Sequence, residues 1–175
     1  MLLFTGNMDY APNVDAVIHF AKNIFPGILK ACPRARFVIA GQRPVQQVKE
    51  LASDKVEVTG FVKDLSELYD KAAIVVAPLR FGAGTQNKVL EAMAMGVPVV
   101  STNIGFEGLG IQSGEGVFRE TTDDAFSDRV CELLNSESLR GKTGSLGNAI
   151  AKSRYGWEAV AARLEGYFER IISEA

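Results

Sequence analysis

The stretch from Ile74 to Ser101, IVVAPLRFGAGTQNKVLEAMAMGVPVVS, decides the fold of this 175-residue chain. It begins with four apolar residues, passes through the loop Gly82-Ala83-Gly84, continues with apolar residues at helical spacing and ends in a second apolar run. A strand, a helix and a second strand in this order are typical of a βαβ unit, in which the two strands lie parallel in one sheet.

The same alternation of short apolar runs and helical patterns extends along the whole chain. The runs that predict strands are Leu2 to Thr5, Arg36 to Ala40, Val56 to Thr59, Ile74 to Ala77, Val97 to Ser101 and the residues near Gly116 to Phe118. The helical patterns lie at Val14 to Ile24, Leu65 to Ala72, Val89 to Met93, Phe126 to Leu134 and Trp157 to Ile172. Several strands are apolar throughout, as strands covered on both faces must be. We therefore predict one α/β domain over residues 1–175, a doubly wound, Rossmann-like parallel sheet in three αβα layers.

Composition and charge limit the classes of protein and partner. A chain of this length forms one domain, or one domain and a small appendage, and a hydrophobic content of 47% excludes an intrinsically disordered chain. The 19 Lys and Arg residues against 21 Asp and Glu residues leave a net charge of -2, without the basic excess that binding to a phosphate backbone requires. We therefore expect no nucleic-acid partner.

Side chains that ligate metals or act as nucleophiles are few. Cys32 and Cys131 match no metal-ligand spacing, and we expect both to be free thiols. The single histidine, His19, falls on the polar side of the first helix beside Asp15 and Lys22, where we expect it in solvent. This set supports neither a zinc site nor a Ser-His-Asp hydrolase, so we expect no metal and no cofactor.

The opening residues, MLLFTGN, carry neither a charged leader nor a long apolar segment. No stretch of the chain reaches the roughly 18 unbroken apolar residues of a membrane span. We therefore expect a soluble protein without a targeting signal, located in the cytoplasm.

Glycines gather just beyond the carboxyl ends of the predicted strands. They are Gly6, Gly41, Gly60, Gly82, Gly84, Gly105, Gly108 and Gly110. The carboxyl ends of parallel strands lie on one edge of a sheet, and open α/β sheets bind their ligands there. Glycine lets the backbone approach a ligand closely. We favour a ligand cleft on this edge over a set of tight turns, because a single turn needs one glycine and not a cluster.

The loop before Lys88 runs directly into a helix, and that order predicts an anion site. Amides at the start of a helix have no internal acceptor and lie at the positive end of its dipole. Thr85 is placed to cap this helix or to contact a phosphate. Lys88 and Glu91 share a helix face that differs from the apolar one and can point toward a ligand; the alternative is an ion pair within the helix.

Two common nucleotide motifs are missing from this loop. It lacks the full G-x-G-x-x-G fingerprint of dinucleotide-binding enzymes, and it lacks the G-x-x-x-x-G-K-[ST] pattern of P-loop kinases and ATPases. The sequence therefore does not favour either class.

Five segments carry a resemblance to a known family. They are FTGNMDYAPNVDAVIHF, FVIAGQRP, VTGFVKDLSELYDKAAIVVAPLR, GAGTQNKVLEAMAMGVPVVST and the YGW that opens the last helix. Together they resemble the carboxyl-terminal, donor-binding domain of a GT-B glycosyltransferase of the large retaining group that uses nucleotide-sugars (group 1, family 4-like). The resemblance covers nearly the whole chain. It implies transfer of a sugar from a nucleoside diphosphate, such as a UDP or GDP sugar, to an acceptor hydroxyl with retention at the anomeric carbon, usually without a bound metal, in polysaccharide or glycolipid biosynthesis.

The resemblance also assigns roles to single residues. Glu91 matches the second Glu of a family motif of two Glu separated by seven residues, and its carboxylate would accept hydrogen bonds from the donor ribose hydroxyls. The further matches are Gly60, Phe61 and Val62 for the turn at the nucleotide base, Gly84 and Thr85 for the loop and helix start at the diphosphate, and Gly6 for the first loop, which faces the diphosphate and the acceptor.

Three positions depart from the family's pattern. Ala83 stands where the first Glu of the motif usually contacts the transferred sugar. Asn7 and Asn13 stand where the first loop often holds Arg and Lys for the diphosphate, so they offer hydrogen bonds but no charge. The cations left on the same sheet edge are Lys88, Arg80 and Arg43. We favour Lys88 for the diphosphate, because the start of its helix points toward the phosphates.

The resemblance has consequences for the rest of the enzyme. Acceptor residues of GT-B enzymes come mostly from an amino-terminal domain, which is absent here, so we expect these residues to bind donor without turnover. The last helix, about residues 157–173 with Trp157 and Tyr167, would reach back toward that domain and leave apolar surface exposed. Peripheral contact with a membrane would belong to the full-length enzyme, because this half lacks a basic amphipathic segment.

Two alternative functions remain open. A non-catalytic nucleotide-binding or assembly module is favoured by Ala83, Asn7 and Asn13. A nucleotide-sugar epimerase of the GT-B type would use carboxylates and histidines in the cleft, whereas we expect His19 on the wrong face of its helix.

Overall fold

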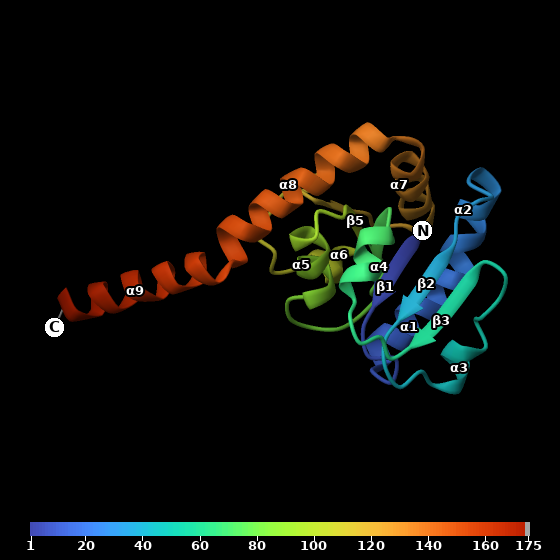
Figure 1. The fold of residues 1–175 in the computed structure, drawn as a ribbon, viewed down its shortest axis with the longest axis horizontal. Coiled ribbons are helices and arrows are strands. Elements are labelled where there is room, and N and C mark those ends of the chain that lie inside the picture. Colours follow the sequence, from blue (N-terminus) through green and yellow to red (C-terminus); the bar gives the residue numbers. More distant parts are fainter. Residues whose placement is uncertain (174–175) are drawn as a thin grey trace.

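The computed structural model describes residues 1–173, which form a six-stranded parallel sheet with helices on both faces (Figure 1). The strands are β1 (Leu2–Thr5), β2 (Phe37–Ala40), β3 (Val56–Gly60), β4 (Ile74–Ala77), β5 (Val99–Ser101) and β6 (Val117–Arg119). They lie in the order β3-β2-β1-β4-β5-β6, and every neighbouring pair is parallel. The chain thus winds outward from β1 in both directions, which confirms the predicted doubly wound α/β fold.

Strands β1 and β4 have the predicted bounds, and the other four differ from the predicted ones by one or two residues at their ends. The largest difference is at β5, which begins at Val99 instead of Val97. The amide of Val97 donates to the Ala92 carbonyl at 2.9 Å and so closes the preceding helix. The Pro98 carbonyl accepts from the Val75 amide of β4 at 3.0 Å, but Pro98 has no amide to offer to a neighbouring strand. The residue pairs with β4 and β6 therefore start at Val99.

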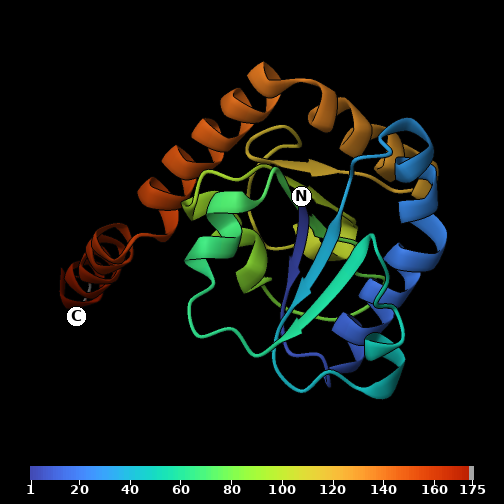
Figure 2. The same cartoon turned by 45° about the vertical axis from the view of Figure 1, so that its right-hand side comes forward.

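The helices are α1 (Ala11–His19), α2 (Phe25–Ala31), α3 (Gln46–Lys49), α4 (Ser66–Lys71), α5 (Asn87–Ala94), α6 (Asn103–Phe106), α7 (Asp123–Asn135), α8 (Glu137–Tyr155) and α9 (Trp157–Ser173). Helices α1, α2 and α7 cover one face of the sheet, and α4, α5 and α8 cover the other (Figure 2). Side chains of each set of helices enter the core on their own face. In β1, Leu2 and Phe4 enter the first core and Leu3 enters the second, as side chains of a strand alternate between its faces.

A π-helical segment, η1 (Phe20–Ile24), joins α1 to α2 and was not predicted. The amide of Phe25 donates to the carbonyl of Phe20, five residues back, and Pro26 has no amide with which to continue an α-helical ladder. The segment places the Phe20 ring 4.6 Å from the ring of Phe37 and 5.9 Å from that of Phe126. These aromatic contacts fix α1 against the sheet and so fix the loop that precedes it.

Helix α8 was not predicted either, because glycines occupy its packing face. A Cβ on Gly144 would lie 1.9 Å from the carbonyl oxygen of Gly96, and a Cβ on Gly147 would lie 3.0 Å from the Cα of Gly116. The absence of side chains at these two positions lets α8 approach the backbone of the loops that flank β5. The helix therefore packs without the apolar stripe that sequence periodicity detects.

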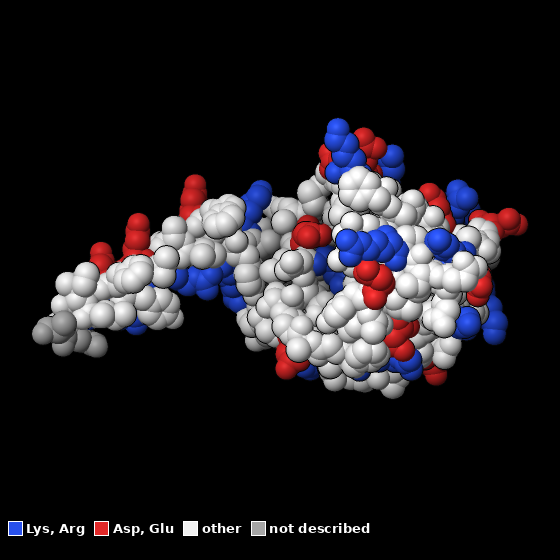
Figure 3. All heavy atoms as spheres, turned by 90° about the horizontal axis from the view of Figure 1, so that it is seen from below, with Lys and Arg blue, Asp and Glu red and all other residues white. Residues whose placement is uncertain are grey.

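Helix α9 projects away from the body of the domain (Figure 1). None of its described residues is buried, and its large apolar side chains are exposed: Trp157, Val160, Leu164, Tyr167, Phe168, Ile171 and Ile172. Figure 3 shows this uncovered helix beside a domain body on which acidic and basic residues are interspersed. The predicted exposure of apolar surface on the last helix is confirmed, and what covers that surface stays a prediction.

Candidate functional site

A cavity of about 340 Å³ opens where β1 ends and α5 begins. Its lining residues are Thr5, Gly6, Tyr10, Asn13, Leu65, Ala83, Thr85, Gln86, Asn87, Lys88 and Glu91. They come from the edge formed by the carboxyl ends of the strands, where open α/β sheets bind ligands. The structure thus brings together the glycine loop, the start of its helix and both charged residues that the sequence singled out.

The amino end of α5 is open. Gln86 precedes the helix without a side-chain cap, and among the described residues the amides of Asn87 and Lys88 have no acceptor. Gly84, with φ +82°, turns the loop into the helix, a backbone conformation that favours glycine. Of the two roles predicted for Thr85, capping of α5 is not observed, because Gln86 is the residue that precedes the helix. Thr85 instead lines the cavity, and its contact with a phosphate stays a prediction.

Lys88 is a buried cation at this helix start, with only 8% of its surface exposed. Its Nζ donates to Asn13 Oδ1 at 3.2 Å and to Gln86 Oε1 at 3.1 Å, and it lies 5.1 Å from the centre of the Phe4 ring. Burial lowers the pKa of Lys88 to about 8, and the nearby charge of Glu91 opposes that shift. Lys88 is therefore protonated at neutral pH and held by neutral oxygens, which leaves its charge available to an anion.

Asn13 connects the first loop to Lys88. It lies in the first turn of α1, where its Nδ2 donates to the Asn7 carbonyl at 3.0 Å. A Cβ on Gly6 would lie 2.6 Å from that nitrogen, so Gly6 is required for this close approach. The side chain of Asn7 is exposed and accepts from Gln42 Nε2 at 2.9 Å. The two asparagines thus organise the loop, but only Asn13 lines the cavity, and Asn7 does not.

Glu91 stands one turn beyond Lys88 with its carboxylate in the same cavity. No ion pair joins the two side chains among the described residues, so the alternative of a salt bridge within the helix does not hold. Instead Tyr69 Oη donates to Glu91 Oε2 at 2.8 Å, and Thr5 Oγ1 lies 3.0 Å from the same hydroxyl. Tyr69 falls within the apolar helical pattern from Leu65 to Ala72, which by itself predicts no contact with Glu91. The available signal is that a buried tyrosine hydroxyl needs a polar partner.

The glycines that end β2 and β3 hold the neighbouring loops close together. A Cβ on Gly41 would lie 1.7 Å from the Gly6 carbonyl oxygen, and the Gly41 amide donates to the Gly60 carbonyl at 3.0 Å. Beyond Gly60, Phe61 is 73% exposed and Val62 packs on the core. Gly60, Phe61 and Val62 lie on the same sheet edge as the cavity but do not line it.

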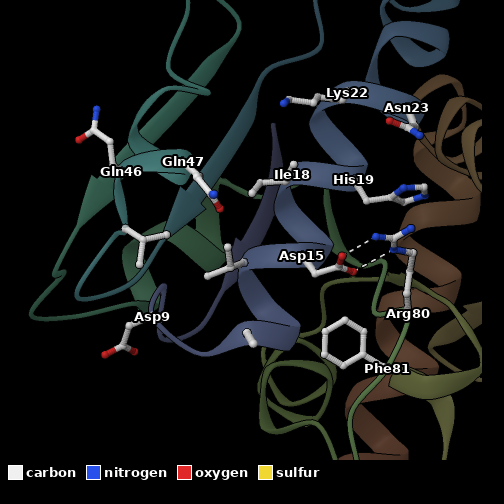
Figure 4. Close-up of a pocket in the computed structure, with 13 residues that line it drawn as sticks. Asp9, Asp15, Ile18, His19, Lys22, Asn23, Gln46, Gln47, Arg80 and Phe81 are labelled. Atoms are coloured by element: carbon white, nitrogen blue, oxygen red, sulfur yellow. Dashed lines mark hydrogen bonds and ion pairs between the residues drawn. The ribbon is translucent and has the colours of Figure 1, made fainter.

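Arg80 and Arg43 point elsewhere. Arg80 Nε donates to Asp15 Oδ2 at 2.8 Å, and a second guanidinium nitrogen bonds the other carboxylate oxygen (Figure 4). This pair lies in the wall of a larger cavity of about 870 Å³ between α1 and α3. Arg43 is exposed, and its Nη1 lies 3.4 Å from Asp9 Oδ2. Among the described residues, Lys88 is thus the only cation that lines the cavity at α5.

We expect Arg80→Ala to change the affinity for a nucleoside diphosphate less than about threefold. The side chain holds the loop before Gly82 against α1 and does not enter the cavity at α5. The pair with Asp15 is partly exposed, so its loss should lower the free energy of unfolding by about 1 kcal/mol. Calorimetric titration and thermal denaturation measure both effects. A loss of affinity of tenfold or more would instead place Arg80 at the diphosphate.

His19 is not in solvent, contrary to the prediction. Its side chain is 13% exposed, and Nε2 lies 2.9 Å from Asp123 Oδ1. His19 is the last residue of α1 and Asp123 is the first residue of α7, so this contact covers the imidazole. His19 does not line the cavity at α5. It is therefore far from the place where an epimerase would need a histidine.

The thiols of Cys32 and Cys131 are free, as predicted, but the fold brings these distant residues together. Burial raises the pKa of Cys131 to about 11, and the neighbouring thiol of Cys32 adds to the shift. Both side chains lie where α2 packs against α7, away from the cavity at α5.

Within residues 1–173 no helix combines the length and apolar character that crossing a bilayer requires.

Comparison with known proteins assigns the chain to a family. The sequence model of the family glycosyl transferases group 1 matches residues 1–136. A Klebsiella pneumoniae protein described as "Uncharacterized 44.6 kDa protein in cps region" is 31% identical over 159 residues, which cover 86% of this chain and 40% of the relative. The phosphatidyl-myo-inositol mannosyltransferase of Mycobacterium leprae is 26% identical over 179 residues, 98% of this chain and 47% of the relative.

A solved structure shares the fold. The S. aureus TarM mutant in complex with Fondaparinux, alpha-GlcNAc-glycerol and UDP superposes with a TM-score of 0.79 at 20% identity, over 95% of this chain and 35% of that one. The present chain thus spans less than half the length of each of these proteins. The match over residues 1–136 and the shared fold agree, and the chain belongs to the glycosyl transferases group 1 family.

Proposed function

We propose that this chain is the donor-binding domain of a retaining glycosyltransferase that transfers a sugar from a nucleoside diphosphate to an acceptor hydroxyl. The observation that carries the proposal is that Lys88, Glu91 and the open amino end of α5 line one cavity of about 340 Å³. Its size lies within the range of small-molecule sites, roughly 300–1,000 Å³. Free amides and a cation suit a diphosphate, and a carboxylate suits a ribose diol.

In the proposed complex the diphosphate lies against the amides of Asn87 and Lys88, with the Lys88 ammonium beside it. Negative charge that builds on the departing diphosphate is then stabilised by groups already in place, which is an effective way to accelerate such a reaction. Glu91 accepts hydrogen bonds from the ribose. The exposed ring of Phe61 stands beyond β3, where the resemblance puts the base.

Calorimetric titration with UDP, GDP and ADP, each beside its nucleoside, tests the proposal and identifies the base. UDP is the first candidate, because the TarM structure of the same fold contains it. We expect at least one diphosphate to bind saturably and more tightly than its nucleoside. Absence of binding by all three would contradict the proposal.

The affinity for the diphosphate is expected to fall above pH 8. Burial lowers the pKa of Lys88 to about 8, so below this pH Lys88 is a cation in the free protein and attracts the ligand. Above it Lys88 must take up a proton on binding, and the affinity falls by up to about tenfold for each pH unit. Titrations in buffers of different ionisation enthalpy measure this proton uptake. Lys88→Arg, which stays charged, is the control; a wild-type profile as flat as that of the control would contradict the assignment.

The remaining expectations concern the whole enzyme. The exposed apolar face of α9 supports a role for this helix in packing on an amino-terminal acceptor domain. Without that domain the chain binds donor and does not turn it over. The proposed location is the cytoplasm, with any peripheral membrane contact made by the full-length enzyme.

A donor-binding module without transfer chemistry is the second candidate. Ala83 lines the cavity where the resemblance calls for a carboxylate at the transferred sugar, and this supports the alternative. Assays of the full-length protein with a panel of nucleotide-sugars separate the two. Neither transfer nor hydrolysis by a protein that binds the diphosphate would favour the module.

A further inference from the structure

A buried tyrosine connects the sheet to the carboxylate of Glu91. Tyr69 lies on α4 with 3% of its surface exposed. Its hydroxyl sits between Thr5 Oγ1, at 3.0 Å on the last residue of β1, and Glu91 Oε2, at 2.8 Å on α5. Three elements that are distant in the sequence thus meet at one oxygen atom.

The direction of the hydrogen bonds follows from the chemistry of the three groups. An ionised carboxylate can only accept, so the single proton of the Tyr69 hydroxyl points to Glu91. The Thr5 hydroxyl must then donate to the Tyr69 oxygen. Burial raises the pKa of Tyr69, and the negative charge of Glu91 raises it further, so the phenol keeps its proton over the whole physiological range. Aligned donors of this kind polarise and strengthen one another.

Glu91 has no other anchor among the described residues. Lys88 Nζ is bonded to Asn13 and Gln86, and Glu91 itself is exposed. A free glutamate side chain samples many rotamers and loses that freedom on binding. Tyr69 occupies Oε2 and leaves Oε1 for a ligand, so the orientation of the carboxylate is set before the ligand arrives.

We infer that Tyr69, supported by Thr5, is a positioning residue that makes the site select a nucleotide with a free ribose diol. The inference rests on the proposed function, because it takes Glu91 as the group that accepts from the ribose. The hydroxyl of Tyr69 acts through Glu91 and does not contact the ligand.

The test compares whichever of UDP, GDP and ADP binds with its 2′,3′-dideoxy counterpart, in the wild type and in Tyr69→Phe. Tyr69→Phe keeps the ring in the core and removes only the donor. We expect it to weaken binding of the ribonucleotide about fivefold to tenfold and binding of the dideoxy nucleotide less than about twofold. The preference for ribose should therefore collapse. Equal losses for both nucleotides, or no loss, would overturn the inference.

Matched variants separate positioning from a general loss of stability. Thr5→Val should lower the preference for ribose over dideoxyribose, but by a smaller factor than Tyr69→Phe does. Thr5→Ser keeps the hydroxyl and should have the ribose preference of the wild type. Tyr155→Phe is the control. It also removes one tyrosine hydroxyl, but that hydroxyl is partly buried outside the cavity, where it donates to the Leu109 carbonyl. It should leave both affinities unchanged.

A measurement without ligand keeps the inference testable even if no nucleotide binds and the proposed function fails. In crystals of the wild type and of Thr5→Ser the Glu91 carboxylate should occupy one orientation against Tyr69. In Tyr69→Phe it should be spread over several. An unchanged, ordered Glu91 in Tyr69→Phe would show that the hydroxyl does not position it.

Discussion

Lys88→Ala should weaken binding of a nucleoside diphosphate by roughly 100-fold, about 3 kcal/mol, and binding of the nucleoside only slightly. The reason is that Lys88 is the only cation among the described residues that lines the cavity at α5. It lies at a helix start where two amides have no acceptor within residues 1–173, and its burial reduces the screening of its charge by solvent. Calorimetric titration of the wild type and the variant with the diphosphate and with the nucleoside measures the loss of affinity for each ligand.

Two further variants make this result specific. Lys88→Met keeps an unbranched apolar side chain and removes the ammonium together with its hydrogen bonds to Asn13 and Gln86, so it should lose as much affinity as Lys88→Ala. Lys142→Ala removes an exposed lysine on α8, away from the cavity, and should leave both affinities unchanged. Equal losses for diphosphate and nucleoside in Lys88→Ala would mean that Lys88 does not face the diphosphate.

Gly144→Ala should lower the free energy of unfolding by about 3 kcal/mol, although alanine is the better helix former. The added Cβ would lie 1.9 Å from the backbone carbonyl oxygen of Gly96, so α8 must move away from the loop before β5. For a domain of this size the melting temperature should fall by roughly 10 °C. Thermal and chemical denaturation measure the change.

Gly141→Ala is the matched control, because Gly141 lies on the exposed side of the same helix with no atom within 4 Å of an added Cβ. At this position only the higher helix propensity of alanine acts, so Gly141→Ala should raise the free energy of unfolding by about 0.5–1 kcal/mol. Opposite signs for the two variants would confirm that close backbone packing, and not composition, holds α8 in place. A gain in both would contradict it.

The sequence predicted the part of the site that depends on one helix. The spacing of Lys88 and Glu91 places them on one face of α5, because helical periodicity is a local property, and the structure puts both in one cavity. The loop of Gly82 and Gly84 before that helix predicted its open amino end. The partners of the two charges could not be predicted, because Asn13 is 75 residues from Lys88 and Tyr69 is 22 residues from Glu91.

By itself the sequence determined the α/β class, the parallel sheet and the edge at which the cavity lies, because short apolar runs alternate with helical patterns and glycines follow the strands. Only the tertiary structure decided the existence of α8, the covered position of His19 and the contact of Thr5 with Tyr69 and Glu91. Each of these depends on which distant segments come within a few ångströms, and a local pattern of residues does not contain that information.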